Sequence, residues 1–165
     1  MTTIRTEQPT STATADFLDR YGVSGLLLGL ALWDALLAVV ALGLPDLWFQ
    51  LFHGIPYVDP QGTPADLVGL LRRSGAVWAA FTLFQFIAFL RWRERPYWLA
   101  VVAGIRLTEV FSDWTYLFFA DHHITWLGGL ALLIAPPSNW LMGWFLVRSY
   151  HRARDAGDRS ELPND

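Results

Sequence analysis

The stretch YWLAVVAGIRLTEVFSDWTYLFFA, residues 97–120, combines an apolar composition with three charged side chains, Arg106, Glu109 and Asp113. Its length is close to the roughly 20 residues that a helix needs to cross the hydrocarbon core of a bilayer. At 100° per residue, the three charges and Tyr116 fall on one stripe of that helix. A charge at the bilayer centre costs about 2.5–3.5 kcal/mol on insertion scales, so we expect the stripe to face other helices or a polar cavity.

The rest of the chain has the composition of a membrane protein. Of its 165 residues, 53% are hydrophobic and 16% are charged, whereas soluble domains carry roughly 25% charged residues. Three further apolar runs of similar length lie at about 22–44, 67–90 and 124–147. We therefore predict an all-α integral membrane protein, an antiparallel four-transmembrane-helix bundle over residues 22–147, with polar cytoplasmic tails at 1–21 and 148–165.

The positions of the basic residues predict the orientation. All 12 are arginine; three lie in residues 91–96, four in 148–165 and two in 1–21, and none lies in the connections 45–66 and 121–123. Because Lys and Arg are enriched in cytoplasmic loops, we expect both termini and the middle loop in the cytoplasm. Exclusive use of arginine is typical of a GC-rich bacterial genome, so the expected location is a bacterial cytoplasmic (inner) membrane.

The first external connection begins with PDLWFQLFHGIP, residues 45–56. Its apolar residues Leu47, Trp48, Leu51 and Phe52 are at helical spacing, which predicts a short helix lying in the membrane interface. The remainder of the connection is rich in Pro and Gly and is typical of turns.

Depth in the membrane suggests partners for the charged stripe. Arg106 and Glu109 are expected near mid-membrane, as is Asp34 in the first span, so Arg106 is predicted to pair with Glu109 or Asp34. Asp113 is nearer the external side. Its expected depth is close to that of the adjacent Arg72 and Arg73 in the second span.

We therefore predict that Asp113 pairs with one of these two arginines, while the other extends to the headgroups. The six charges sum to zero, which suits a network that only fixes helix register. The alternative is a polar cavity for a ligand headgroup, an ion or protons, because intramembrane ionisable groups are commonly functional.

The fourth run contains LLIAPPSNWLMG, with Pro136 and Pro137 near mid-membrane. Two prolines remove two backbone donors, so we predict a kink or a break in this helix. Ser138 and Asn139 follow directly, and they can either cap a half-helix or compensate for the kink.

The first span carries GLLLG, residues 25–29, and places Gly25 and Gly29 about half a turn away from Asp34. If Asp34 faces the bundle, the two glycines face outward and can meet a partner helix. The reverse arrangement, with Asp34 toward a partner, is also open. The external His53, His122 and His123 resemble a metal cluster only loosely, so we expect solvated histidines and no metal site.

Several classes of function are excluded by the sequence. The absence of cysteine excludes disulfides and thiolate sites, and the net charge of -3 predicts no binding to nucleic acid. No HExxH, GxSxG, P-loop or dinucleotide glycine pattern is present, so no catalytic residue and no cofactor beyond a bound lipid are predicted. We predict an accessory or structural subunit of a larger membrane protein complex. The alternative is a binder, carrier or enzyme for a lipid- or quinone-like amphipathic molecule that uses the Arg/Glu/Asp cluster.

Overall fold

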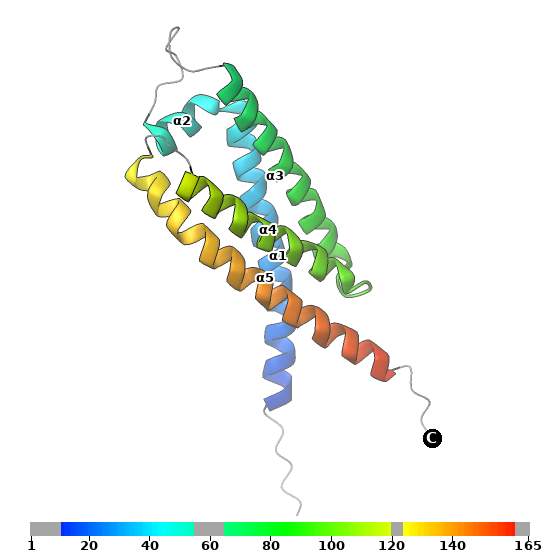
Figure 1. Ribbon diagram of the computed structural model, residues 1–165. Coiled ribbons are helices and arrows are strands. Elements are labelled where there is room, and N and C mark those ends of the chain that lie inside the picture. Colours follow the sequence, from blue (N-terminus) through cyan, green and yellow to red (C-terminus); the bar gives the residue numbers. More distant parts are fainter. Residues whose placement is uncertain (1–10, 55–64, 120–123, 161–165) are drawn as a thin grey trace, which may run out of the picture.

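The computed structural model describes residues 11–54, 65–119 and 124–160, with side chains described for 21–54, 67–118 and 124–156. Over these ranges the chain forms helices and no strand, which confirms the all-α prediction. The five helices are α1 (Ser11–Gly43), α2 (Pro45–His53), α3 (Ala65–Arg91), α4 (Tyr97–Phe119) and α5 (Trp126–Ser160) (Figure 1).

Three helical segments are long and apolar enough to cross a membrane: Tyr21–Gly43, Leu67–Arg91 and Trp126–Ala156. They coincide with, or extend, three of the predicted spans. The α4 helix has 23 residues, or about 34 Å at 1.5 Å per residue, but three charged residues lie in its middle, Arg106, Glu109 and Asp113. The α1 and α5 helices also continue into the two predicted polar tails, to Ser11 and Ser160.

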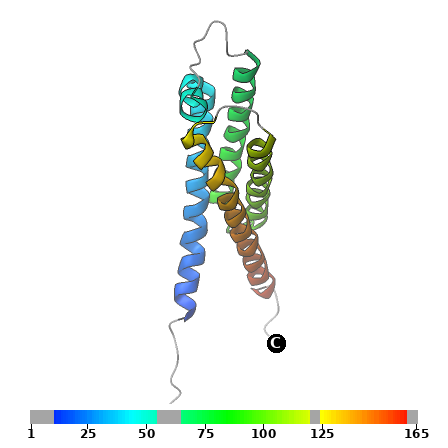
Figure 2. The same cartoon turned by 60° about the vertical axis from the view of Figure 1, so that its left-hand side comes forward.

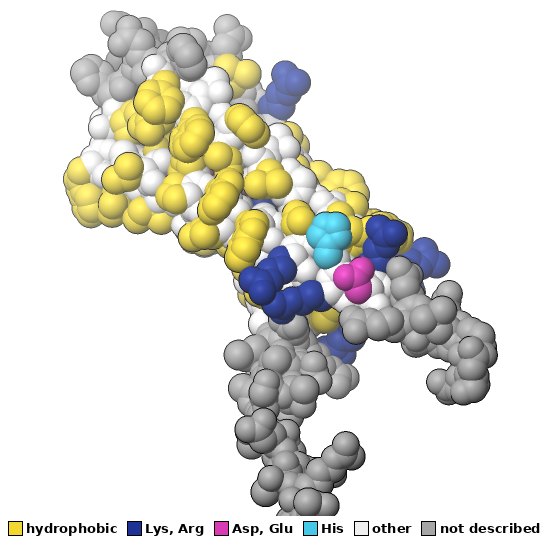
Figure 3. Space-filling view, turned by 60° about the horizontal axis from the view of Figure 1, so that its bottom comes forward, with side chains coloured by type: hydrophobic (Ala, Val, Ile, Leu, Met, Phe, Trp, Pro, Cys, Tyr) yellow, Lys and Arg dark blue, Asp and Glu magenta, His cyan; other side chains and the backbone are white. Residues whose placement is uncertain are grey.

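The four long helices form two antiparallel pairs. The α1 helix packs along α3, and α4 packs along α5 (Figures 1 and 2). At one end the short α2 contacts α1, α3 and α5. Away from α2 lies the α3–α4 loop, and the start of α1 and the end of α5 extend beyond it (Figures 1 and 2). Arginine side chains gather at that opposite end, beyond a broad hydrophobic surface (Figure 3).

Each pair has a glycine at a point of close approach. A Cβ atom on Gly75 of α3 would lie 2.9 Å from Cγ of Leu42 in α1. A Cβ atom on Gly143 of α5 would lie 2.9 Å from Cγ of Leu107 in α4. Small residues allow membrane helices to pack closely, and these two glycines hold the members of each pair together.

The two pairs meet tightly in only one half of the molecule. A buried apolar cluster near the α3–α4 loop includes residues of all four long helices: Val23, Leu27, Leu30, Ala88, Leu99, Val102, Ala103 and Leu146. In the other half, a second buried cluster contains residues of α1, α2 and α3: Ala41, Phe49, Val68 and Leu71. The α4/α5 pair is therefore separated from the α1/α3 pair toward the α2 end.

The α2 helix is fixed to the start of α5. It ends at Gly54, whose φ of 64° is the left-handed conformation that favours glycine at a helix C-terminus. The backbone N–H of Thr125 then donates to the carbonyl of Phe52 at 3.0 Å. Gly128 lies so close to α2 that an added Cβ atom would be 2.6 Å from the Phe52 carbonyl oxygen.

The α5 helix continues without interruption through Pro136 and Pro137. The predicted break, with a half-helix starting at Ser138, is therefore wrong, and a kink stays a prediction. The two prolines leave only the carbonyls of Leu132 and Leu133 without their helical donors. Pro136 is fully buried, and packing against neighbouring helices is one reason that membrane helices tolerate proline.

Candidate functional site

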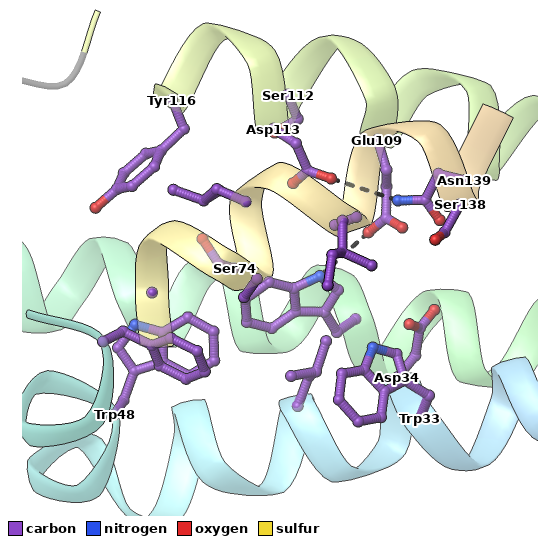
Figure 4. A pocket seen from close by; sticks show the side chains of 18 of the residues that line it. Trp33, Asp34, Trp48, Ser74, Glu109, Ser112, Asp113, Tyr116, Ser138 and Asn139 are labelled. Atoms are coloured by element: carbon purple, nitrogen blue, oxygen red, sulfur yellow. Dashed lines mark hydrogen bonds between the residues drawn. The ribbon is translucent and has the colours of Figure 1, made fainter. Parts of the chain in front are cut away.

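A cavity of about 1000 Å³ lies between the two helix pairs and is lined by residues of all five helices. Most of its wall is apolar and is formed by leucine, isoleucine and aromatic side chains. Figure 4 shows Trp33 of α1, Trp48 of α2, and Glu109 and Asp113 of α4 around the same space. The cavity thus combines an apolar wall with several polar groups.

The cavity is an open cleft. On α1, Gly25, Gly29 and Trp33 line it and are exposed; on α5, the exposed Leu130 and Ile134 do so. The α1 and α5 helices make little contact with each other. An apolar molecule can therefore enter from the side between these helices.

Arg106 is the centre of the polar cluster. Its guanidinium is almost completely buried and pairs with Asp34 of α1, which is 1% exposed. Its Nη1 also lies 2.9 Å from Oε2 of Glu109. Both predicted partners are therefore present at once. Nε2 of Gln85 in α3 donates to Asp34 at 2.7 Å, so buried polar groups join α1, α3 and α4.

Neutral donors and acceptors extend this cluster. Nη1 of Arg106 donates to Oδ1 of Asn139 in α5 at 3.5 Å. Nδ2 of Asn139 donates to Oδ2 of Asp113 at 3.4 Å, and the indole N–H of Trp78 donates to Glu109 at 3.2 Å. Figure 4 shows Asp113 and Asn139 pointing toward each other from α4 and α5. The network therefore includes α5 as well.

The predicted pairing of Asp113 with Arg72 or Arg73 is wrong. Both arginines are exposed on α3, and neither forms an ion pair with a residue whose side chain the structure describes. Leu71 lies on the inward face of α3 and is buried. Arg72 and Arg73 follow it directly, so the helical repeat rotates them away from that face by about 100° and 200°. Depth alone therefore did not determine the partner. The predicted charge balance fails too, because one guanidinium faces three carboxyl groups.

Tyr116 lies at the α2 end of the cavity. Its hydroxyl is 3.4 Å from Nε2 of His53, and both residues line the cavity. His122 and His123 fall outside the described residues. Among the residues that are described, no group of three or more His, Cys, Asp or Glu side chains could hold a metal ion.

The glycines of the first span lie at the edge of the cleft. A Cβ atom built on Gly25 or Gly29 would have no neighbouring atom within 4 Å. Asp34 is buried against Arg106. Of the two arrangements considered for this helix, the structure therefore has the one with Asp34 inside, and the glycines lie at the open edge of the cavity.

Two site residues were not predicted from the sequence. Gln85 is completely buried, and a polar amide within an apolar membrane-length run was a usable signal for it. Trp78 gave no such signal, because tryptophan is expected at membrane interfaces. Within the described chain, Oε1 of Gln85 and Nε of Arg106 are buried without a hydrogen-bond partner.

No protein-family model, curated protein or solved structure matches the chain. A functional proposal therefore rests on the chemistry of the cavity. Its apolar wall and its few convergent polar groups are the usual features of a binding site for a small organic molecule.

Proposed function

We propose that the protein binds a lipid- or quinone-like amphipathic molecule in the cleft between the α1/α3 and α4/α5 pairs. The observation that carries this proposal is the buried Arg106 cluster at the wall of a mostly apolar cavity of about 1000 Å³. Ligand pockets commonly measure about 300–1,000 Å³, so the volume suits a large ligand. The polar head would lie near Glu109 and Asp113, and the apolar body would lie against the leucines and tryptophans of the wall.

We propose further that α4 is the fourth membrane span and completes a four-helix bundle. Its length supports this, as does the direction of its charges, because Arg106 and Glu109 face Asp34 and the cavity. The α5 helix would bend at its two prolines. The arginine-rich end would face the cytoplasm with both termini, and α2 would lie in the outer interface of a bacterial inner membrane.

A second candidate is an accessory or structural subunit of a larger membrane complex. The open surface at Gly25 and Gly29 supports it, because a helix of another subunit can pack closely on two glycines four residues apart. The same glycines border the cleft. A partner helix at this position would therefore compete with a ligand for the same opening.

Purification from native membranes in a mild uncharged detergent separates the two candidates. Native mass spectrometry would report the particle mass, the co-purifying polypeptides and any retained small molecule. We expect the protein with a bound amphipathic molecule. Stoichiometric partner polypeptides without a small molecule would favour the subunit instead.

A matched pair of variants tests whether the cavity holds the molecule. Ala131 lines the cavity, so Ala131→Trp would fill part of it. Ala100 is also exposed, on α4, but does not line the cavity. We expect Ala131→Trp to lose the co-purifying molecule and Ala100→Trp to retain it. Equal retention by both variants would count against binding in the cleft.

A further inference from the structure

The charges that line the cavity do not balance. Its lining includes one guanidinium, that of Arg106, and the three carboxyl groups of Asp34, Glu109 and Asp113. Arg106 pairs with Asp34 in the most buried part of the cluster, where both side chains are at most 2% exposed. This pair is internally neutral, and the imbalance falls on the other two carboxyl groups.

Glu109 and Asp113 have few remaining partners. Glu109 shares the Arg106 guanidinium at 2.9 Å and accepts from the neutral indole of Trp78. Asp113 accepts from the neutral amide of Asn139 at 3.4 Å. The two carboxyl groups are four residues apart on α4, which places their Cβ atoms about 5–6 Å from each other on one face. Both carboxyl groups can therefore approach the same cationic group.

The sign of the charge selects the ligand. An anionic headgroup would meet two carboxylates and a guanidinium that already has two carboxylate partners, so repulsion would exceed attraction. A cation would neutralise charges that are costly to keep in an apolar cavity. The other titratable groups on the lining are His53 and Tyr116 at the α2 end, where the Tyr116 hydroxyl lies 3.4 Å from Nε2 of His53.

Aromatic rings supply a second attraction for a cation. Trp33, Trp48, Trp78 and Tyr116 line the same cavity. The face of an aromatic ring attracts ammonium groups, and more strongly where water is excluded. A bare metal ion fits poorly, because the described residues provide no group of three acidic or histidine ligands and the wall is largely apolar.

We propose that the ligand is an amphipathic organic cation whose ammonium or quaternary head sits between Glu109 and Asp113, with its apolar body against the aromatic wall. This inference rests on the proposed function, since it specifies the ligand of the same cleft. It narrows the expected ligand from any lipid- or quinone-like amphipathic molecule to a positively charged one.

Three probes of similar shape test the inference: tetraphenylphosphonium as the cation, triphenylphosphine oxide as the neutral compound and tetraphenylborate as the anion. Binding to the purified protein in an uncharged detergent would be measured by equilibrium dialysis, with empty micelles subtracted. We expect saturable binding of the cation that is at least tenfold tighter than that of the neutral probe. The anion should bind more weakly than either.

The variants Glu109→Gln and Asp113→Asn remove one negative charge each with little change of shape. We expect each to weaken cation binding at least tenfold and to weaken binding of the neutral probe by a much smaller factor. Asp113→Asn is the safer variant, because Asp113 is bonded to Asn139 and not to the buried guanidinium. Glu94→Gln is the matched control, because Glu94 is an exposed carboxylate paired with Arg91 away from the cleft.

The outcomes separate this inference from the proposed function. Equal binding of the cation and the neutral probe, or cation binding unaffected in a folded Asp113→Asn variant, would overturn the inference and leave an amphiphile site in place. If no probe bound saturably and Ala131→Trp still retained the co-purifying molecule, both the inference and the proposed function would be overturned.

Discussion

Replacing Arg106 by methionine would remove the cation from a buried site and keep the apolar part of the side chain. Asp34, at 1% exposure, would lose its ion-pair partner, and Glu109 would lose it as well. Removing one partner of a buried ion pair costs about 3–5 kcal/mol, because the remaining charge stays buried and uncompensated. We expect Arg106→Met to lower the free energy of unfolding by an amount in this range.

The chain contains a matched control at its surface. Arg91 and Glu94 form an ion pair at 3.0 Å whose side chains are 57% and 66% exposed. Exposed pairs contribute about 0–1 kcal/mol, so Arg91→Gln should have a small effect. The double variant Arg106→Met/Asp34→Leu removes both buried charges. In the double variant the Gln85 amide loses its acceptor, at a cost of about 1–3 kcal/mol. This cost is smaller than the cost of about 3–5 kcal/mol for an uncompensated buried charge, so the double variant should be more stable than Arg106→Met alone.

Unfolding would be followed by far-ultraviolet circular dichroism during titration of an uncharged detergent with a denaturing anionic one. The three variants and the wild type would be compared under identical conditions. If Arg106→Met lost no more stability than Arg91→Gln, the buried ion pair would not stabilise the helix arrangement. If the double variant were less stable than Arg106→Met, an uncompensated Asp34 would not be the cause of the loss.

The remaining predictions concern packing and orientation. Gly143→Val should destabilise by about 1–3 kcal/mol, because a Cβ atom there would already lie 2.9 Å from Leu107. Gly129→Val should change the free energy of unfolding by no more than about 0.5 kcal/mol in the same assay, because no atom lies within 4 Å of a Cβ built there. Equal effects of the two variants would contradict the packing argument. The chain has no cysteine, so single variants report the orientation. A membrane-impermeant maleimide applied to spheroplasts should label Gln50→Cys of α2 and not Glu94→Cys of the α3–α4 loop, and the reverse pattern would refute the proposed orientation.

Part of the candidate site was predictable because it depends on local geometry. The helical repeat places Arg106 and Glu109 on one stripe, and the rise per residue places Asp34 at a similar depth. Both pairs occur in the structure. The charged stripe and the depth of each residue belong to single helices, so they do not depend on how the helices pack.

The partner of Asp113 was not predictable in the same way. Depth made Arg72 and Arg73 candidates, but the rotation of α3 places both on its exposed side. Asn139 takes that position from α5 instead. The rotation of a helix about its own axis is determined by the side chains packed against it, such as Gly75 of α3 beside Leu42 of α1, and depth says nothing about that contact.

The sequence by itself determined the helices and one charged face. A helix that lies in hydrocarbon must satisfy its backbone hydrogen bonds internally, so long apolar runs are sufficient to identify the helical segments. Only the tertiary structure decided that α1 pairs with α3 and α4 with α5, and that these pairs separate toward α2 to leave a cavity. Lipid and side chains are equally apolar, so hydrophobicity does not choose the partner of a helix. That choice depends on close packing at small residues such as Gly75 and Gly143 and on buried polar contacts such as that of Arg106 with Asp34.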